Sequence, residues 1–105
     1  MQSRGASTTL VADPDTETWT ETAPRYRVLM HNDDVTTMDF VVGLLRTIFR
    51  KPAGEARTIM LEVHETGVAL VEIVPLEEAE LHVDQCHSLA RARGFPLALT
   101  IEYAD

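Results

Sequence analysis

The chain has 105 residues, of which 45% are hydrophobic and 25% charged, so length and composition allow one small globular domain. Its formal net charge of -8 argues against binding nucleic acid or an anionic membrane surface, because both require a basic surface. No stretch is apolar enough to span a bilayer, and the N-terminus lacks the pattern of a signal peptide. Cys86 is the only cysteine, so no intrachain disulfide can form, which is typical of a protein in the reducing cytoplasm. We expect Cys86 to be a small buried residue.

Residues 1–24 have the composition of a disordered N-terminal extension. Ser, Thr, Asp and Glu dominate there, and too few apolar side chains are present to offset the entropy of ordering the segment. Trp19 is the exception: it either lies on the domain surface or touches a partner, and the sequence favours neither. From residue 25 the pattern becomes regular, so we expect one folded domain over residues 25–105.

The first strand is predicted over residues 25–31, because apolar and polar residues alternate there and give the strand one apolar face. Three polar residues follow at once, at the corner between this strand and the next helix: Asn32, Asp33 and Asp34. Thr36 and Asp39 fit a capping box, in which the Thr hydroxyl bonds the first turn and the acid reaches back.

Two helices are predicted after this corner by apolar residues at helical spacing. The first carries a stripe of six residues: Met38, Val41, Val42, Leu45, Ile48 and Phe49. Residues 51–54 read Lys-Pro-Ala-Gly and break the pattern. The second helix carries apolar residues on one side: Ala56, Met60 and Val63. His64 lies one turn beyond Met60, and Gly67 ends this helix.

Residues 68–74 form a nearly continuous apolar run, which predicts a strand covered on both faces and stopped by Pro75. The next helix begins with acidic residues that suit its macrodipole: Glu77, Glu78 and Glu80. Its inner stripe is Ala79, Val83, Cys86 and Ala90, and its end is marked by Arg91, Arg93 and Gly94. A last strand alternates apolar residues: Leu97, Leu99, Ile101 and Tyr103.

The expected order of elements is therefore β-α-α-β-α-β. Three strands and three helices in this order predict an α+β fold, a small three-stranded antiparallel sheet with three helices packed on one face.

The polar corner, together with His64 and the apolar helix faces, suits a ligand with a cationic head and a hydrophobic side group. A carboxylate, an amide and an imidazole can replace the water shell of an ammonium group, which is costly to bury otherwise. The free amino terminus of a peptide with a large apolar first residue is such a ligand.

Other interpretations of the corner remain open. In a purely structural one, Asn32 and Asp33 form a turn, Asp34 caps the helix, and His64 ends its helix in solvent. An acid–base pair of Asp33 and Asp34 is disfavoured, because neighbouring residues rarely face one cleft at the separation required. A metal site that adds His31 to these groups lacks any recognisable ligand spacing. We therefore expect no metal and no other cofactor.

The segments Tyr26–Phe40, Met60–His64 and Pro96–Leu97 make the sequence resemble the ClpS family. These proteins are adaptors that deliver N-degron substrates to a Clp-type AAA+ unfoldase and its protease. The motifs Asn-Asp-Asp…Thr-x-Met-x-Phe-Val and Met-Leu-x-Val-His are specific in combination, and the similarity runs over residues 26–102 without a gap. The fold of the family agrees with the order of elements given above.

The resemblance implies a role for each residue of the site. Asn32, Asp33 and His64 would hold the α-amino group of the substrate, with Asp34 acting through a water and Thr36 nearby. The pocket for the first side chain would be lined by Met38, Val41, Met60, Val63 and Leu97. Met38 would exclude β-branched side chains from the pocket.

The sequence departs from the common family pattern at a few positions. Thr37 stands where proline is frequent and Val35 where an aromatic residue is frequent. On the surface that would face the unfoldase, Glu77 matches the family, whereas His82 replaces a common lysine.

We therefore expect a monomeric, non-enzymatic adaptor. It would bind free N-termini that begin with Leu, Phe, Tyr or Trp and present them to a ClpA- or ClpC-like unfoldase. The alternative is a peptide-binding module, or an inhibitor of such an ATPase, without delivery for degradation. A small acid–base enzyme built on the Asp pair is a third interpretation.

Overall fold

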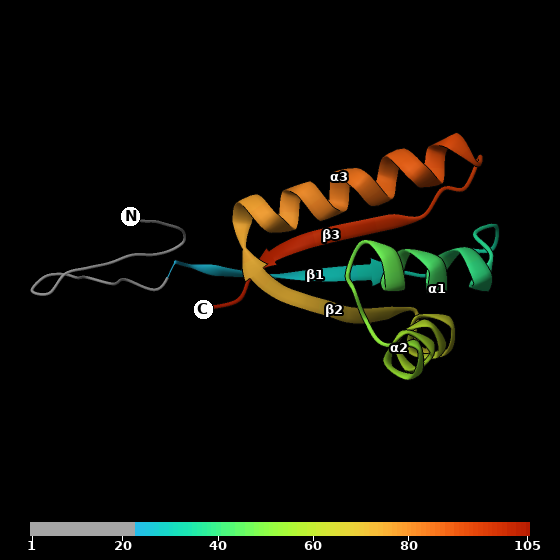
Figure 1. Cartoon of the computed structure of the whole chain (residues 1–105), viewed down its shortest axis with the longest axis horizontal. Helices are drawn as coiled ribbons and strands as arrows, with labels where there is room; N and C mark the ends of the chain where they lie inside the picture. The colour runs from blue at the N-terminus through green and yellow to red at the C-terminus, as the bar shows by residue number, and fades with distance from the viewer. Residues whose placement is uncertain (1–22) are drawn as a thin grey trace, which may run out of the picture.

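A computed structural model describes residues 23–105, and its elements follow the predicted β-α-α-β-α-β order (Figure 1). The elements are β1 (Arg25–His31), α1 (Met38–Thr47), α2 (Ala53–Thr66), β2 (Val68–Pro75), α3 (Leu76–Ala92) and β3 (Ala98–Tyr103). The predicted N-terminal extension, with Trp19, lies outside the described residues except for its last two positions. Within residues 23–105, none of the helices combines the length and apolar character that crossing a membrane requires.

β1 is the central strand of a three-stranded antiparallel sheet with the order β2-β1-β3. On the β2 side, Val28 pairs with Glu72 but Leu29 pairs with Leu70, so the register skips Val71. Directly opposed residues of an antiparallel pair have their side chains on the same face. The bulge therefore puts Glu72 on the face of the buried Val28, whereas unbroken alternation would turn it to the other face.

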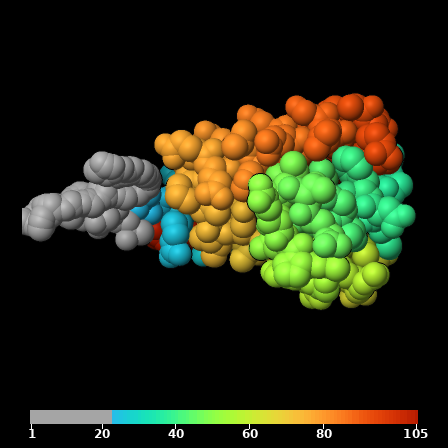
Figure 2. Space-filling model, in the orientation of Figure 1, coloured from blue at the N-terminus to red at the C-terminus, as the bar shows by residue number. Residues whose placement is uncertain are grey.

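The three helices lie on one face of this sheet, as predicted. α3 contacts all three strands, α2 lies against β2, and α1 packs on α2. Figure 2 shows α1 and α2 side by side, next to the first turns of α3. On the other face, Val68, Leu70 and Ile73 are 38%, 43% and 40% exposed. The prediction that this strand is covered on both faces is therefore wrong, and its apolar residues reflect β-propensity more than burial.

The hydrophobic core fills the space between the sheet and the helices. Its largest fully buried side chains are Met30, Leu45, Leu97, Val28 and Cys86. Each buried side chain of Val or Leu size stabilises the fold by about 1.5–3 kcal/mol, so this layer holds the ends of β1, α1 and α2 in place. Cys86 is buried as expected; burial, with Glu72 adding, raises the pKa of its thiol to about 12 and keeps it protonated.

Helix α1 begins one residue later than the predicted capping box allows. Thr37 is the N-cap residue, and its hydroxyl accepts a hydrogen bond from the Phe40 N–H at 3.2 Å. The predicted pairing of Thr36 with Asp39 is therefore wrong, and Thr36 bonds Asp33 instead. Thr37 thus has a capping role that a proline at this position would lack.

The connection between α1 and α2 agrees with the prediction in part. α1 ends at Thr47 and Pro52 is the N-cap residue of α2, so Lys51 and Pro52 do separate the two helices, whereas residues 53–54 already belong to α2. Gly67 ends α2 as predicted, with a φ of 94° in the left-handed region that favours glycine.

Candidate functional site

The candidate site begins where β1 ends. The Asn32 N–H donates to the carbonyl oxygen of Gly67 at 2.9 Å, which ties the end of β1 to the end of α2. On the β3 side, His31 Nε2 lies 2.7 Å from the hydroxyl of Thr100. Because the corner is held from both sides, the side chains that follow it project from a rigid base.

Asp33 organises the turn that leads into α1. Its Oδ1 accepts hydrogen bonds from the N–H groups of Val35 (2.8 Å) and Thr36 (2.7 Å), and its Oδ2 accepts from the Thr36 hydroxyl (2.8 Å). The structural interpretation was therefore right that Asp33 makes a turn. The helix cap at Asp34, which the same interpretation contains, is not observed, since Thr37 caps α1.

The same hydrogen bonds keep Asp33 ionised. Burial alone would raise the pKa of its carboxyl, but the bonds from Thr36 and Val35, with the charge of Arg91, outweigh burial and lower it below 3.8. A carboxylate has about four acceptor positions, and the turn uses three of them. Asp33 therefore carries a negative charge and keeps acceptor capacity for a ligand.

A cavity of about 220 Å³ opens beside this corner. Its polar lining residues are Asn32, Asp33, Asp34, Thr36 and His64, and its apolar lining residues are Met38, Val41, Met60 and Val63. Pockets for drug-sized molecules hold about 300–1,000 Å³, so this cavity is suited to a smaller group, such as one side chain.

The apolar wall of the cavity is part of the core. Val41, Met60 and Val63 are only 6%, 7% and 3% exposed, so packing holds them in place. Met38, the first residue of α1, is 43% exposed, and its unbranched side chain has three rotatable bonds. The cavity thus joins rigid apolar residues to one flexible thioether.

His64 joins this wall because of helical spacing. It lies four residues after Met60 on α2, so both side chains are on the same helix face. The ring is exposed, stands in the last turn of α2 and borders the cavity. A neutral imidazole has one donor and one acceptor nitrogen, so His64 can accept a hydrogen bond there.

Leu97 is the one predicted pocket residue that does not line the cavity. It is 1% exposed and lies in the core, just before β3. The Arg91 guanidinium donates to its carbonyl oxygen at 3.0 Å. Sequence alternation identified Leu97 as inward-facing but did not say which inward-facing residues reach a cavity.

Glu77 and His82, predicted at the unfoldase interface, lie apart from the cavity on α3. Glu77 is exposed in the first turn. His82 is half-buried, and its Nδ1 lies 2.6 Å from Oε2 of Glu72 on β2. The position of Glu72 could not be predicted, because no pattern in the sequence reveals the bulge. The spacing of Glu78 and His82, four residues apart on a helix, was a signal available there.

The comparisons with known proteins decide the family. The family model described as "ATP-dependent Clp protease adaptor protein ClpS" matches residues 21–100. The chain belongs to the ClpS family. A ClpS from Oleidesulfovibrio alaskensis, named an ATP-dependent Clp protease adapter protein, is 46% identical over 102 residues, covering 97% of this chain and 98% of that protein. A ClpS of the same name from Desulfatibacillum aliphaticivorans is 47% identical over 83 residues, covering 79% and 80%.

A solved structure confirms the fold at the level of the backbone. Agrobacterium tumefaciens ClpS2, bound to L-phenylalaninamide, superposes with a TM-score of 0.76 at 31% identity, covering 79% of this chain and all of that one. The resemblance seen in the corner and helix motifs is thus confirmed over nearly the whole described region. ClpS proteins are adaptors of the Clp protease by family description, and the family name describes no enzyme.

Proposed function

We propose that this protein binds the free N-terminus of polypeptides that begin with Leu, Phe, Tyr or Trp, and delivers them to a ClpA- or ClpC-like AAA+ unfoldase and its protease. The observation that carries the proposal is the cavity beside Asp33, where an ionised carboxylate, an amide and an imidazole adjoin a rigid apolar wall.

The chemistry of the cavity matches both parts of such a ligand. The α-ammonium group would donate to Asp33 and Asn32 while His64 accepts, which replaces the water that the ammonium loses. The first side chain would lie against Val41, Met60 and Val63. Burying one large apolar group contributes about 1.5–3 kcal/mol, and the charge-assisted hydrogen bonds make that affinity depend on a free amino group.

The ligand of the Agrobacterium relative supports the same assignment. L-Phenylalaninamide has a free α-amino group and a benzyl side chain, which are the two features that the cavity matches here. Asp34 and Thr36 border the polar side and would support the amino-group contacts, the first through a water molecule.

The acid–base enzyme is the weaker alternative. Asp33 has a lowered pKa and most of its acceptor positions engaged in the turn, so it is a poor proton donor near neutral pH. An interaction module or ATPase inhibitor without delivery differs from an adaptor only in the step after peptide binding. The cytoplasmic location and monomeric state stay predictions of the sequence.

Fluorescence anisotropy with peptides that differ only in the first residue tests the binding step. A Phe-starting peptide should bind, and its N-acetylated form should lose about 3 kcal/mol or more, ~150-fold, because Asp33 would face a group that cannot pair with it. Binding of the acetylated peptide within a few-fold of the free one would contradict the proposal.

Delivery is tested separately with a variant that starts at Arg25. The described residues that line the cavity all lie between Asn32 and His64. Because the sequence predicts residues 1–24 to be a disordered extension, we expect its removal to leave peptide affinity unchanged. We expect this variant to bind Phe-starting peptides normally but to fail to speed their degradation by the unfoldase and protease. Normal delivery by this variant would indicate that transfer to the unfoldase depends on the α3 surface with Glu77 and His82. Loss of peptide binding would indicate that the N-terminal extension contacts the pocket.

A further inference from the structure

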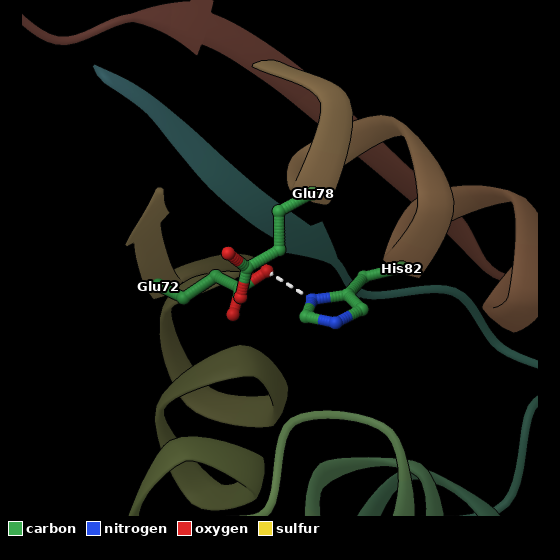
Figure 3. A group of neighbouring side chains, drawn as sticks. All are labelled: Glu72, Glu78 and His82. Atoms are coloured by element: carbon green, nitrogen blue, oxygen red, sulfur yellow. Dashed lines mark hydrogen bonds and ion pairs between the residues drawn. The ribbon is translucent and has the colours of Figure 1, made fainter. Parts of the chain in front are cut away.

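A second group of chemically active side chains lies outside the candidate site. Glu72 on β2 and Glu78 and His82 on α3 turn toward one another where these two elements meet (Figure 3). None of the three lines the cavity beside Asp33. Two separate features of the backbone bring them together.

The first feature is the bulge at Val71. It places Glu72 opposite Val28, on the face of the sheet covered by the helices. A carboxylate there is withdrawn from water, and the side chain of Glu72 is only 11% exposed. Burying a carboxylate is costly unless a partner compensates its charge.

The second feature is the spacing on α3. Glu78 and His82 are four residues apart, so their side chains leave the same face of the helix one turn apart. One ligand atom from each of the three residues lies within 4.8 Å of the others. Glu78 is exposed in the first turn of α3, where its charge also suits the helix dipole, and its carboxylate adds a third possible ligand to the Glu72–His82 pair.

The His82 ring is held in place at this point. Its side chain is 16% exposed, its Nδ1 lies 2.6 Å from Glu72 Oε2, and the Phe49 ring packs edge-on against it at 5.4 Å between centroids. Since a carboxylate only accepts, the proton of this hydrogen bond is assigned to Nδ1. A metal ion bound at Nδ1 would displace that proton.

The donor set favours one class of ion. One imidazole nitrogen and two carboxylates suit Zn²⁺, Co²⁺ or Ni²⁺, whereas Ca²⁺ and Mg²⁺ prefer six or more oxygen ligands, many of them water. In a tetrahedral site with metal–ligand distances of about 2.1 Å, ligand atoms are about 3.4 Å apart, so small rotations suffice. The same three residues border a cavity of about 500 Å³, which leaves room for water as a further ligand.

We propose that Glu72, Glu78 and His82 form a binding site for a divalent transition-metal ion such as Zn²⁺. The ion would balance two carboxylates that face a single imidazole and would link β2 to the first two turns of α3. His82 also belongs to the surface proposed to contact the unfoldase, but metal binding requires neither a peptide nor an unfoldase. The two proposals therefore fail or succeed independently.

Titration of the metal-free full-length protein with Co²⁺ tests the site, because Co²⁺ reports inner-sphere ligands through visible absorption bands. We expect saturation at one ion per chain and displacement of Co²⁺ by Zn²⁺. His82→Gln should abolish the bands, and Glu78→Gln should weaken binding at least ~10-fold, the lower end of losses seen even for outer-shell partners. Glu80→Gln, an exposed acid on the same helix, is the matched control and should bind like the parent protein.

Three outcomes would overturn the proposal. The first is titration without saturation. The second is unchanged Co²⁺ binding in His82→Gln, because the ion would then be bound elsewhere, for example by His64. The third is an equal loss in Glu80→Gln, because that would indicate general attraction to an acidic helix. Peptide binding measured on the same samples reports on the cavity beside Asp33 alone.

Discussion

Replacing Asp33 separates its two roles, turn formation and ligand binding. Asp33→Ala removes three hydrogen bonds of 2.7–2.8 Å that hold the turn before α1. Each contributes about 0.5–1.5 kcal/mol net, and the side chain is half-buried, so we expect a loss of about 2 kcal/mol in the free energy of unfolding. For a domain of this size, that lowers the Tm by about 8–16 °C.

Asp33→Asn is the sharper variant, because it keeps the shape of the side chain. Its Oδ1 still accepts from the two backbone N–H groups, and the Thr36 hydroxyl can rotate to accept from the new amide. We therefore expect a Tm within a few degrees of the parent protein. The lost charge should cost about 1.5–3 kcal/mol in binding a Phe-starting peptide, about 10–150-fold in Kd.

Fluorescence anisotropy and thermal melts on the same samples give both quantities. Asp84→Asn, an exposed acid on α3, controls for the change in net charge. If Asp33→Asn binds the peptide within about threefold of the Asp84→Asn control, Asp33 does not contact the ammonium and the turn is its whole function. A large fall in the Tm of Asp33→Asn would instead show that the turn requires the charge.

Three further predictions address the pocket rim, the backbone and pH. Met38→Ala should bind Ile- or Val-starting peptides more tightly and Phe-starting peptides slightly less tightly, because it removes the exposed thioether that borders the cavity. Unchanged selectivity in fluorescence anisotropy would show that another residue excludes β-branched side chains. Gly43→Ala, in the middle of α1, should raise the free energy of unfolding by about 0.5–1 kcal/mol, whereas Gly67→Ala should lower it by about 1–2 kcal/mol. A new Cβ meets open space at both positions, but only Gly67 has a positive φ, so urea midpoints that shift in the same direction would contradict this reasoning. Burial, with the charge of Arg91, lowers the pKa of His87 below its ordinary 6.5, and its Nε2 accepts from the Leu99 N–H at 3.0 Å. The folded state therefore resists protonation of His87. The contribution of His87 to the free energy of unfolding is present above pH 6.5 and is lost as the pH falls toward the lowered pKa. In His87→Gln, the urea midpoint should lack this part of its pH dependence.

The order of elements, and most core residues, could be predicted because periodicity reports which faces are buried. The stripe of α3 and the apolar side of α2 are examples, since helical spacing alone places their residues on one face. The glycine after α2 was also predictable, because few other residues adopt a positive φ there.

Other features depended on contacts that periodicity does not encode. Thr36 and Thr37 are chemically equivalent as caps, and the choice between them is set by the hydrogen bonds of Thr36 to Asp33. The bulge at Val71 shifts the register by one residue, and nothing local in the sequence distinguishes it from a regular strand. Leu97 was assigned to the pocket by the family resemblance, and its sequence pattern indicates burial but not whether a buried residue lines the cavity.

The central place of β1 has a consequence for when the protein can fold. The first strand of the domain pairs on both sides with strands that come much later in the chain, and Arg27 lies opposite Glu102. At its start, the carbonyl oxygen of Arg25 accepts from the N–H of Ala104 at 2.9 Å. Contacts of such long sequence separation form slowly, because the loop entropy is lost before the contacts form. During synthesis, the sheet that supports the Asp33 corner can therefore be completed only after the last strand has left the ribosome, and removal of β3 should prevent folding of the whole domain.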